Sequence, residues 1–300
     1  MRGRFSPTTI VGNLQWHLLG ILGKKFVVRN VHGFQMELHM KDQGLSKQLF
    51  VHGKREAEHA FILQKVVRPG IRILEIGANI GYYCLLEKRL APDSQIIAAE
   101  PHPENFRILE RNLAGNRIAD IETHCVAVSD TTERSTLHTS RMGNCHSLNP
   151  EPNAKVAYTG CLEVPTTTVE KLANRRSIDL IRMDIEGHEV RVFRSLRQTL
   201  LRQGCFPAVL FEVHRKKYHA QNSLARELEE FHRHGYHAQY LGTSGPKGTA
   251  MLSAQGLPCI AKVESDHTVR GVFTHVRIPD LIRALDSHGG IRAVCLSRPT

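Results

Sequence analysis

Between residues 69 and 241, apolar residues occur with two different spacings. Short apolar runs are typical of buried strands, and apolar residues three or four positions apart are typical of amphipathic helices. The runs predict strands at 71–76, 95–100, 121–128, 178–184, 208–213 and 236–241. The wider spacing predicts helices at 82–90, 103–114, 169–173, 189–201 and 223–234. Repeated strand–helix–strand units predict an α/β fold, a mostly parallel sheet with helices on both faces.

The residues before this core form a predicted N-terminal extension. Its expected elements are an apolar helix at 11–22, a β-hairpin at 26–31 and 34–40, and a helix at 45–67. The hairpin is indicated by alternation around a His32-Gly33 turn, and Pro69-Gly70 ends the last helix.

Two later segments depart from the rhythm. Residues 130–165 are rich in Thr, Ser, Asn and Pro, and an insertion of this kind often covers the ligand site of an α/β core. A helix at 279–285 and a closing strand at 291–297 are predicted near the end, whereas the rest of 242–290 has no clear pattern. The predicted domains are an extension at 1–68, a core at 69–241 and a C-terminal segment at 242–300.

The run Glu75-Ile-Gly-Ala-Asn-Ile-Gly81 is the strongest chemical signal. It follows a predicted strand and precedes a predicted helix, where Gly77 and Gly81 let a ligand approach the backbone. The free N–H groups of the helix favour a carboxylate or phosphate. The spacing is not Gly-x-Gly-x-x-Gly, so it does not favour an NAD-dependent oxidoreductase.

Two acidic residues extend this signal. Glu75 lies near the carboxyl end of its strand, where it can accept a hydrogen bond from an ammonium group. Glu100 ends the next strand, 23 positions after Gly77, and is placed to accept both hydroxyls of a ribose. A ligand with an amine, a carboxylate and a ribose fits these partners, and S-adenosylmethionine is such a ligand. Ser129 or Asp130, at the end of the third strand, is placed to bond the adenine amine, although a simple turn explains these residues equally well.

Asp184, Glu186 and His188 follow the strand at 178–184 and form a candidate acid/base cluster. Helix capping explains one of the acids but not the whole group. His214 ends the next strand on the same edge and is a candidate general base, with a structural role as the alternative. Asp184, Glu186 and His214 also allow a metal-assisted variant, although no resident metal is predicted.

Charge and cysteine content add less. The chain of 300 residues has 40 Lys and Arg against 29 Asp and Glu, a net charge of +11 spread along its length. Such a surface attracts acidic glycans, lipid head groups or nucleic acid, and no aromatic-interleaved RNA-binding pattern supports the last. Seven cysteines without a Cys-x-x-Cys pair or a signal peptide indicate a reducing compartment with free thiols.

The apolar stretch at 11–22 is too short to span a bilayer. It can lie at a membrane surface with Trp16 as an interfacial anchor, as in a peripheral membrane protein. Packing against the domain or against a protein partner is an equal alternative. The oligomeric state is not predicted.

Five motifs together resemble the FkbM-like methyltransferases, a branch of the class I S-adenosylmethionine-dependent enzymes. They lie at 75–83, 99–106, 127–130, 164–169 and 179–189. The resemblance covers roughly residues 40–215 and implies the seven-stranded class I fold, S-adenosylmethionine as cofactor and a cytoplasmic enzyme. It usually implies O-methylation of a sugar, glycan or natural product. Glu75 in place of Asp, Arg182-Met183 in place of Lys-Ile, and His188 in place of a small residue depart from the family pattern.

The complete set of site predictions follows from the residues and the resemblance together. The predicted cofactor contacts are Glu75, Gly77, Ala78, Asn79, Gly81, Tyr82, Glu100, Asn105 and Ser129. The candidate catalytic residues are Asp184, Glu186 and His214. N- or C-methylation of a small metabolite and a non-catalytic nucleotide-binding or interaction module remain alternative functions.

Overall fold

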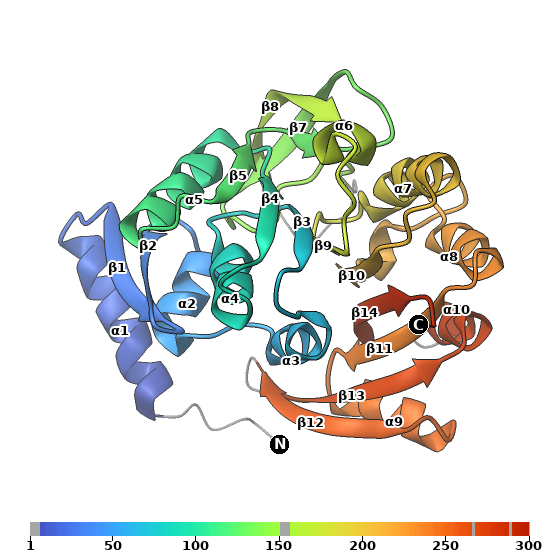
Figure 1. Ribbon diagram of the computed structural model, residues 1–300. Helices are drawn as coiled ribbons and strands as arrows, with labels where there is room; N and C mark the ends of the chain where they lie inside the picture. Colours follow the sequence, from blue (N-terminus) through green and yellow to red (C-terminus); the bar gives the residue numbers. More distant parts are fainter. Residues whose placement is uncertain (1–6, 151–156, 266–267, 288–289, 300) are drawn as a thin grey trace.

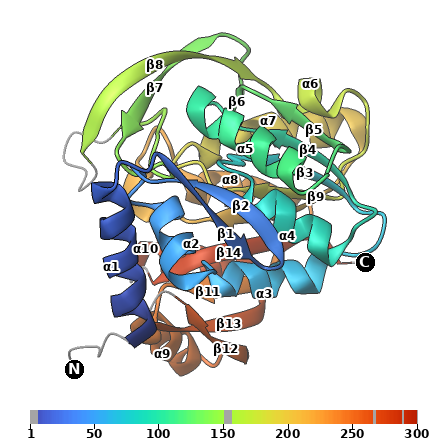
Figure 2. The ribbon, with the colours of Figure 1, turned by 90° about the vertical axis from the view of Figure 1, so that its left-hand side faces the viewer.

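A computed structural model describes residues 7–150, 157–265, 268–287 and 290–299 (Figures 1 and 2). Its large sheet contains β3 (Arg72–Ile76), β4 (Gln95–Ala99), β5 (Ile121–His124), β9 (Leu180–Met183), β10 (Ala208–Glu212), β11 (His237–Thr243), β12 (Cys259–Ser265), β13 (Thr268–Val276) and β14 (Ile291–Ser297). The nine strands lie in the order β12-β13-β11-β14-β10-β9-β3-β4-β5.

The direction of the strands confirms the predicted fold class. β5, β4, β3, β9 and β10 run parallel to one another, and β14 runs antiparallel between β10 and β11. These seven strands form the class I arrangement, with one reversed strand near the end. The antiparallel strands β13 and β12 extend the sheet further. They come from residues 242–290, for which the sequence analysis predicted no strand.

Helices cover both faces of the sheet, because successive side chains of a strand point to opposite sides. On β3, Leu74 and Ile76 pack with α6 (Val169–Ala173), α7 (Glu189–Gln203), α8 (Leu224–Arg233) and α10 (Ile278–Ser287). Ile73 packs on the other face with α3 (Ala57–Val66), α4 (Tyr82–Leu90) and α5 (Pro103–Gly115). The remaining helix of the C-terminal segment, α9 (Pro246–Ala254), lies beside β13.

The N-terminal extension contains α1 (Pro7–Ile21), the antiparallel pair β1 (Phe26–Val31) and β2 (Phe34–His39), and α2 (Leu45–His52). The predicted helix at 45–67 is two helices, because Gly53 ends α2 with a left-handed backbone and Glu56 has φ 48° before α3. The interfacial role suggested for Trp16 is wrong. Trp16 is buried, and its ring centroid lies 5.3 Å from that of Phe50 on α2.

A small second sheet lies beyond β5 at the top of Figure 1. It consists of β6 (Ala127–Val128), β7 (Arg134–Ser140) and β8 (Tyr158–Thr167) in the order β6-β8-β7. The predicted strand at 121–128 is therefore two strands in different sheets. β7 and β8 pair antiparallel within the segment 130–165. Within the described residues, no helix is long and apolar enough to cross a membrane.

A buried ion pair joins the centre of the large sheet. Glu75 on β3 and Arg182 on β9 are paired in the strand register, and Arg182 Nη1 lies 2.7 Å from Glu75 Oε1. Both side chains are almost fully buried, and Arg182 also lies over the Tyr83 ring at 3.5 Å. Burial raises the pKa of Glu75 to about 7, although Arg182 acts in the opposite direction. The pair continues to Asp184, whose Oδ2 is 3.7 Å from Arg182 Nη2.

We expect Arg182→Met to lower the free energy of unfolding by about 3–5 kcal/mol, because it leaves a buried carboxyl group without its partner. The double variant Glu75→Leu/Arg182→Met removes both charges and should recover most of this loss. Urea denaturation of the three proteins measures the difference. A single variant as stable as the unsubstituted chain would show that the pair does not hold the sheet centre.

Candidate functional site

A cleft opens at the carboxyl ends of β3, β4 and β9. Ligand sites in open α/β sheets lie at this edge, where the strand order reverses direction. Residues far apart in the sequence line the cleft: Ile76, Gly77, Asn79, Ala99, Glu100, Pro101, Val126, Ala127, Val128, Leu137, Gly143, Asn144, His146, Leu148, Asp184, Ile185, Glu186 and His188.

The glycine turn forms one wall of the cleft. Gly77 has φ +79°, and a Cβ there would lie 2.5 Å from the carbonyl oxygen of Asp184. Gly81 has φ +89°, and a Cβ there would lie 2.7 Å from Leu109 Cδ1. Both positions therefore require glycine for conformation and for space. The turn leads directly into α4, whose first N–H groups have no partner within the helix.

Glu100 lies beside this turn, and two backbone groups hold its carboxylate. Oε2 accepts a hydrogen bond from the Asn79 N–H at 2.9 Å, and Oε1 accepts one from the His102 N–H at 2.9 Å. Each oxygen retains a lone pair for a further donor. Burial raises the pKa of Glu100 to about 7, against the effect of these backbone donors.

Apolar side chains and the ring of His146 line the next part of the cleft. Val126, Val128, Leu137 and Leu148 contribute the apolar surface. The ring of His146 stacks on His102, with centroids 4.1 Å apart and 19° between the planes. Burial lowers the pKa of His146 to about 3, so the imidazole is neutral at physiological pH. A flat, apolar heterocycle matches this slot.

The segment 141–149 closes one side of the cleft. The carbonyl oxygen of Gly143 accepts hydrogen bonds from Asn79 Nδ2 and Asn105 Nδ2, both at 2.8 Å. The Gly143 N–H donates to Asp42 Oδ1 at 2.7 Å, which links this segment to the N-terminal extension. Asn105 therefore supports the wall of the cleft from behind.

Ser129 also lies behind the wall. Its hydroxyl is 3.0 Å from His188 Nε2, and Asn149 Nδ2 is 3.2 Å from the other ring nitrogen. Burial lowers the pKa of His188 to about 4, so this imidazole is neutral. Ser129 and His188 thus fix the position of the strand ends.

Four carboxylates surround the imidazole of His214. Nδ1 lies 2.8 Å from Glu189 Oε1, and Nε2 lies 3.6 Å from Asp184 Oδ1 and from Glu186 Oε1. Glu212 Oε1 is 4.0 Å from the same nitrogen. Burial lowers the pKa of His214, but the carboxylates, Glu189 first, raise it well above its ordinary value. Burial raises the pKa of Glu186, while His214 lowers it.

The structure brings some of the predicted residues together and separates others. Gly77, Asn79, Glu100, Asp184 and Glu186 line the same cleft, and His214 contacts its acidic end. The predicted cofactor contacts that do not line it are Glu75, Ala78, Gly81, Tyr82, Asn105 and Ser129.

Glu75 and Tyr82 have other partners in this structure. The Glu75 side chain is fully buried against Arg182, and the Tyr82 hydroxyl lies 3.0 Å from His32 Nε2. Neither side chain reaches the cleft, so their contacts with a cofactor remain predictions.

The sequence analysis missed two functional groups of the site. Glu189 holds His214, and its position in the first turn of a helix was the available signal. The stacked pair His102 and His146 carries no local signal, because the two residues meet only after the segment 130–165 folds over the cleft.

Gly77→Ala should lower the free energy of unfolding by about 1–3 kcal/mol, because a left-handed backbone and a contact with Asp184 both oppose a Cβ there. Gly115→Ala is the matched control, since Gly115 is helical and its Cβ would meet nothing within 4 Å. Thermal unfolding measures both. Equal stability of the two variants would show that the turn tolerates a side chain.

The sequence matches a known protein family and one curated relative. The family described as "Methyltransferase FkbM domain" matches residues 75–238. Methyltransferase 1 of Beauveria bassiana (strain ARSEF 2860) is 26% identical over 143 residues, which are 41% of this chain and 57% of that protein.

Two solved structures are also similar to this chain. Methyltransferase FkbM from Methylobacillus flagellatus KT has 12% identity and a TM-score of 0.39, over 76% of this chain and 52% of that one. The SAM-dependent O-methyltransferase of Thermotoga maritima has 10% identity and a TM-score of 0.43, over 85% and 71%. The chain thus spans little more than half of the curated relative and of the Methylobacillus protein. Because the family match covers more than half of the sequence, the chain belongs to the FkbM methyltransferase domain family.

Proposed function

We propose that this protein transfers the methyl group of S-adenosylmethionine to a hydroxyl group of a sugar, glycan or natural product. The observation that carries the proposal is the cleft itself. At one end lie a glycine turn and Glu100, a carboxylate placed to accept hydrogen bonds from ribose hydroxyls. The carboxylates of Asp184 and Glu186 lie at the other end. Membership of the FkbM family supports the same activity.

The residues present fit S-adenosylmethionine. Gly77 lines the cleft beside the first turn of α4, whose free N–H groups suit the carboxylate of the methionine end. The free lone pairs of Glu100 suit the two ribose hydroxyls. The apolar slot beside His146 suits the adenine ring. Glu75 is engaged by Arg182, so this geometry does not support the predicted contact with an ammonium group.

S-adenosylmethionine, when bound, supplies a methyl group on a positively charged sulfur that leaves with its bonding electron pair. The acceptor oxygen forms the new bond to the methyl carbon, and the hydroxyl proton passes to a base. The protein aligns the acceptor with the methyl group and receives that proton.

We assign the base to Glu186. It lines the cleft, and burial raises the pKa of its carboxyl toward the pH at which a general base is effective. His214 is less suited to this role than the sequence suggested, because the surrounding carboxylates, Glu189 first, raise its pKa well above the ordinary value and so favour its protonated form. We assign to His214 the positioning of Asp184 and Glu186, with Asp184 orienting the acceptor.

Substitution of the two ends of the cleft should separate binding from chemistry. Glu100→Gln is expected to weaken S-adenosylmethionine binding at least 10-fold, because it removes the charged acceptor of the ribose. Glu186→Gln should leave binding within about twofold and lower methyl transfer by about 10²–10⁴-fold, the range for loss of a general base. Isothermal titration and transfer of a labelled methyl group to fractionated glycans and lipids measure the two effects.

Two results would contradict this proposal. One is the absence of both a thermal shift and a binding heat with S-adenosylmethionine. The other is an unchanged affinity in Glu100→Gln. Label found on nitrogen or carbon of the product, and not on oxygen, would leave the cofactor assignment intact and replace the acceptor class.

A further inference from the structure

We propose that His214, Asp184 and Glu212 bind a divalent metal ion, Mn²⁺ or Zn²⁺. One potential ligand atom from each of these three residues lies within 4.8 Å of the others. Imidazole together with carboxylates is a donor set suited to these ions. The claim that this ion lies where the methyl acceptor binds rests on the proposed function. The choice of ligands does not depend on it.

The distances fit an ion better than they fit hydrogen bonds. His214 Nε2 lies 3.6 Å from Asp184 Oδ1, 3.6 Å from Glu186 Oε1 and 4.0 Å from Glu212 Oε1. These separations are too long for hydrogen bonds. An ion with bonds of about 2.1 Å in tetrahedral geometry places its ligand atoms about 3.4 Å apart. Asp184, Glu212 and His214, whose ligand atoms lie within 4.8 Å of one another, therefore need only small movements to meet one ion.

The groups behind these ligands favour the same arrangement. Glu189 lies 2.8 Å from His214 Nδ1 and keeps the proton on that nitrogen, so that Nε2 presents its lone pair once a metal ion has displaced the second proton. A carboxylate behind the ligating histidine is the usual support of a metal site. Glu189 is itself held by the Tyr218 hydroxyl at 3.1 Å.

Glu212 supplies a separate indication of a missing ligand. Its side chain is 9% exposed, and Oε2 has no hydrogen-bond partner among the described residues. Arg292 Nη2 lies 3.1 Å from the other oxygen, Oε1, which is also the oxygen 4.0 Å from His214 Nε2, so the carboxylate has to turn to direct Oε2 at the ion. On Asp184, Arg55 and Arg182 likewise lie 3.8 and 3.7 Å from Oδ2, which leaves Oδ1 for the ion. A buried carboxylate oxygen without a donor is costly unless a cation or a proton occupies it.

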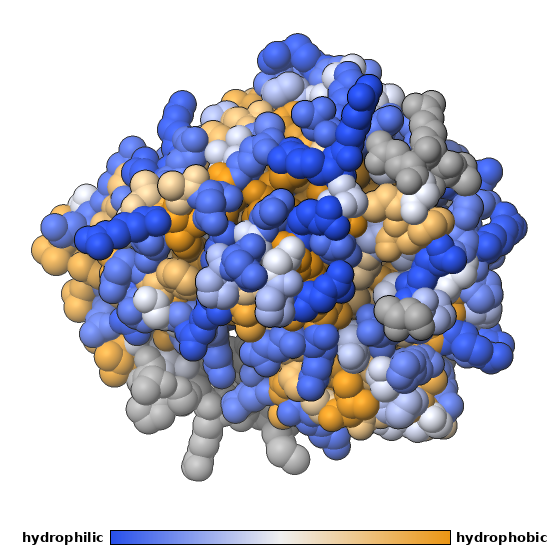
Figure 3. All heavy atoms as spheres, viewed as in Figure 1, coloured by the Kyte–Doolittle hydropathy of each residue, from blue (hydrophilic) through white to orange (hydrophobic). Residues whose placement is uncertain are grey.

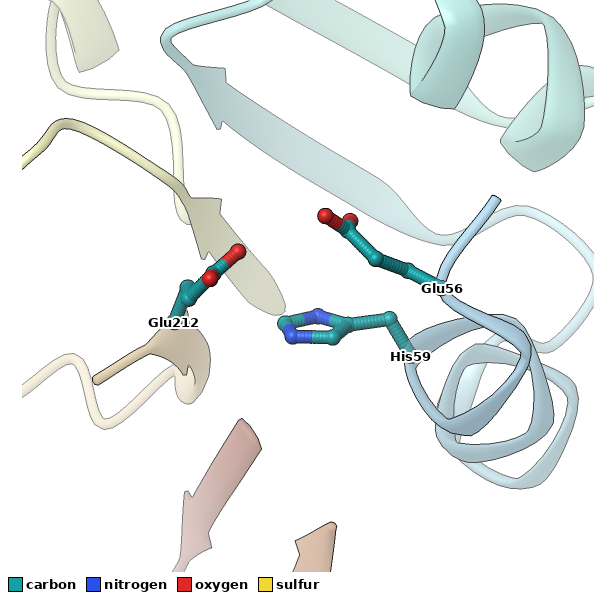
Figure 4. Close-up of side chains that lie close together, drawn as sticks. All are labelled: Glu56, His59 and Glu212. Atoms are coloured by element: carbon teal, nitrogen blue, oxygen red, sulfur yellow. The ribbon is translucent and has the colours of Figure 1, made fainter. Parts of the chain in front are cut away.

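A second group of potential ligands shares Glu212 but is less suitable. Figure 4 shows the side chains of Glu56 and His59 close to Glu212. Neither ring nitrogen of His59 has a partner within the described residues, which points to a small ligand there too. However, Glu56 already accepts hydrogen bonds from Arg55, Arg292 and the Tyr83 hydroxyl. These guanidinium charges oppose a divalent ion at Glu56, and we place the ion at His214.

An ion at this position would act on the acceptor. A divalent cation coordinates a hydroxyl oxygen and lowers the pKa of its proton, which assists removal by Glu186. It would also neutralise part of the charge that four carboxylates concentrate around His214. The expected acceptor is one that presents two neighbouring oxygens, because such a group chelates an ion.

Metal binding is measured on chelator-treated protein without cofactor, by titration with MnCl₂ and with ZnCl₂. We expect one ion per chain, and at least 10-fold weaker binding in His214→Gln and Asp184→Asn. His188→Asn is the matched control, since His188 lies at the same strand end but faces Ser129. His59→Gln tests the second group of potential ligands, Glu56, His59 and Glu212. Both His188→Asn and His59→Gln should bind the ion as tightly as the unsubstituted chain.

The proposal is overturned by the absence of saturable binding. It is also overturned if His214→Gln and Asp184→Asn bind normally, or if binding is lost only in His59→Gln. Thermal unfolding checks that each variant is folded, and Asp184→Asn keeps the test valid if His214→Gln is not. S-adenosylmethionine titrated into the same samples tests the proposed function separately, because its failure leaves the metal result unchanged.

A different observation concerns α1, and from it we infer that α1 binds the surface of an anionic membrane. One face of the helix carries Ile10, Leu14, Leu18 and Ile21, which are 59%, 60%, 49% and 82% exposed, and Leu22 follows at 72%. Figure 3 shows apolar residues at the left-hand edge of the molecule, where Figure 1 places α1. An apolar strip of this size on a soluble surface marks a contact site.

The opposite face of α1 already packs against the protein. Trp16 is buried on Phe50, and a Cβ at Gly12 would lie 3.2 Å from Val51. The helix is therefore apolar on both sides. A helix with this pattern needs a second apolar neighbour.

Charge favours a lipid surface over a second copy of the chain. Residues 1–36 contain Arg and Lys but no acid, and Glu37 is the first acidic residue. Lys24, Lys25 and Arg29 are exposed just after the helix. Two copies paired through α1 would bring these like charges together, whereas anionic head groups attract them.

Flotation with phosphatidylcholine vesicles, with and without phosphatidylserine, tests this inference. The protein should float only with the anionic vesicles, and Leu14→Ser/Leu18→Ser should abolish flotation. Ile260→Ser/Val269→Ser is the matched control, because it removes two exposed apolar side chains elsewhere and should change nothing. No flotation of the unsubstituted chain, or a dimer in sedimentation that only the α1 variant loses, would overturn the inference.

Discussion

The buried pair of Glu75 and Arg182 is the constraint on which the rest of this structure depends. Two opposite charges face each other across β3 and β9, in the middle of the sheet. A buried pair adds little net stability, but removing one partner is costly, so it fixes the register of the two strands whose ends carry the site. Arg182 also lies 4.0 Å from Glu56 Oε2 in the N-terminal extension and 3.7 Å from Asp184 Oδ2 in the cleft. The extension is therefore part of the site's support.

At the acidic end of the cleft, too, cationic side chains balance the negative charge of the carboxylates. Guanidinium groups approach its carboxylates from the protein interior, and His214 approaches from the other side. On Asp184, Oδ2 faces Arg55 and Arg182 and Oδ1 faces His214, whereas on Glu212 the oxygen Oε1 is nearest to both Arg292 and His214. A site arranged in this way is prepared for a cation, whether that cation is a proton on His214 or a metal ion. This gives the acceptor end a chemistry different from that of the Glu100 end, where neutral backbone donors hold the carboxylate.

Much of the fold could be predicted from the sequence, because periodic elements depend on local pattern. Tyr82–Leu90, Val169–Ala173 and Ile291–Ser297 have the predicted bounds, and the glycine turn and Glu100 lie at the cleft as expected. The break at Gly53 was not predicted, although a glycine with a left-handed backbone is a local signal for the end of a helix. β12 and β13 were missed because their exposed positions mix polar and apolar residues. The position of Glu75 was not predicted either, since its partner lies 107 residues away.

Three glutamates of this site show why residue type alone does not determine a role. Glu75 and Glu100 both have a pKa raised to about 7 by burial, yet Glu75 faces a guanidinium and Glu100 faces backbone N–H groups. Glu186, also raised by burial, faces a charged imidazole at the mouth of the cleft. The first is committed to an internal partner, the second retains free lone pairs, and the third can exchange a proton with a ligand. The sequence places all three near strand ends, but only packing distinguishes a structural charge from a binding group and from a base. The same argument changes the role of His214, because four surrounding carboxylates make it a poor base and a good holder of charge.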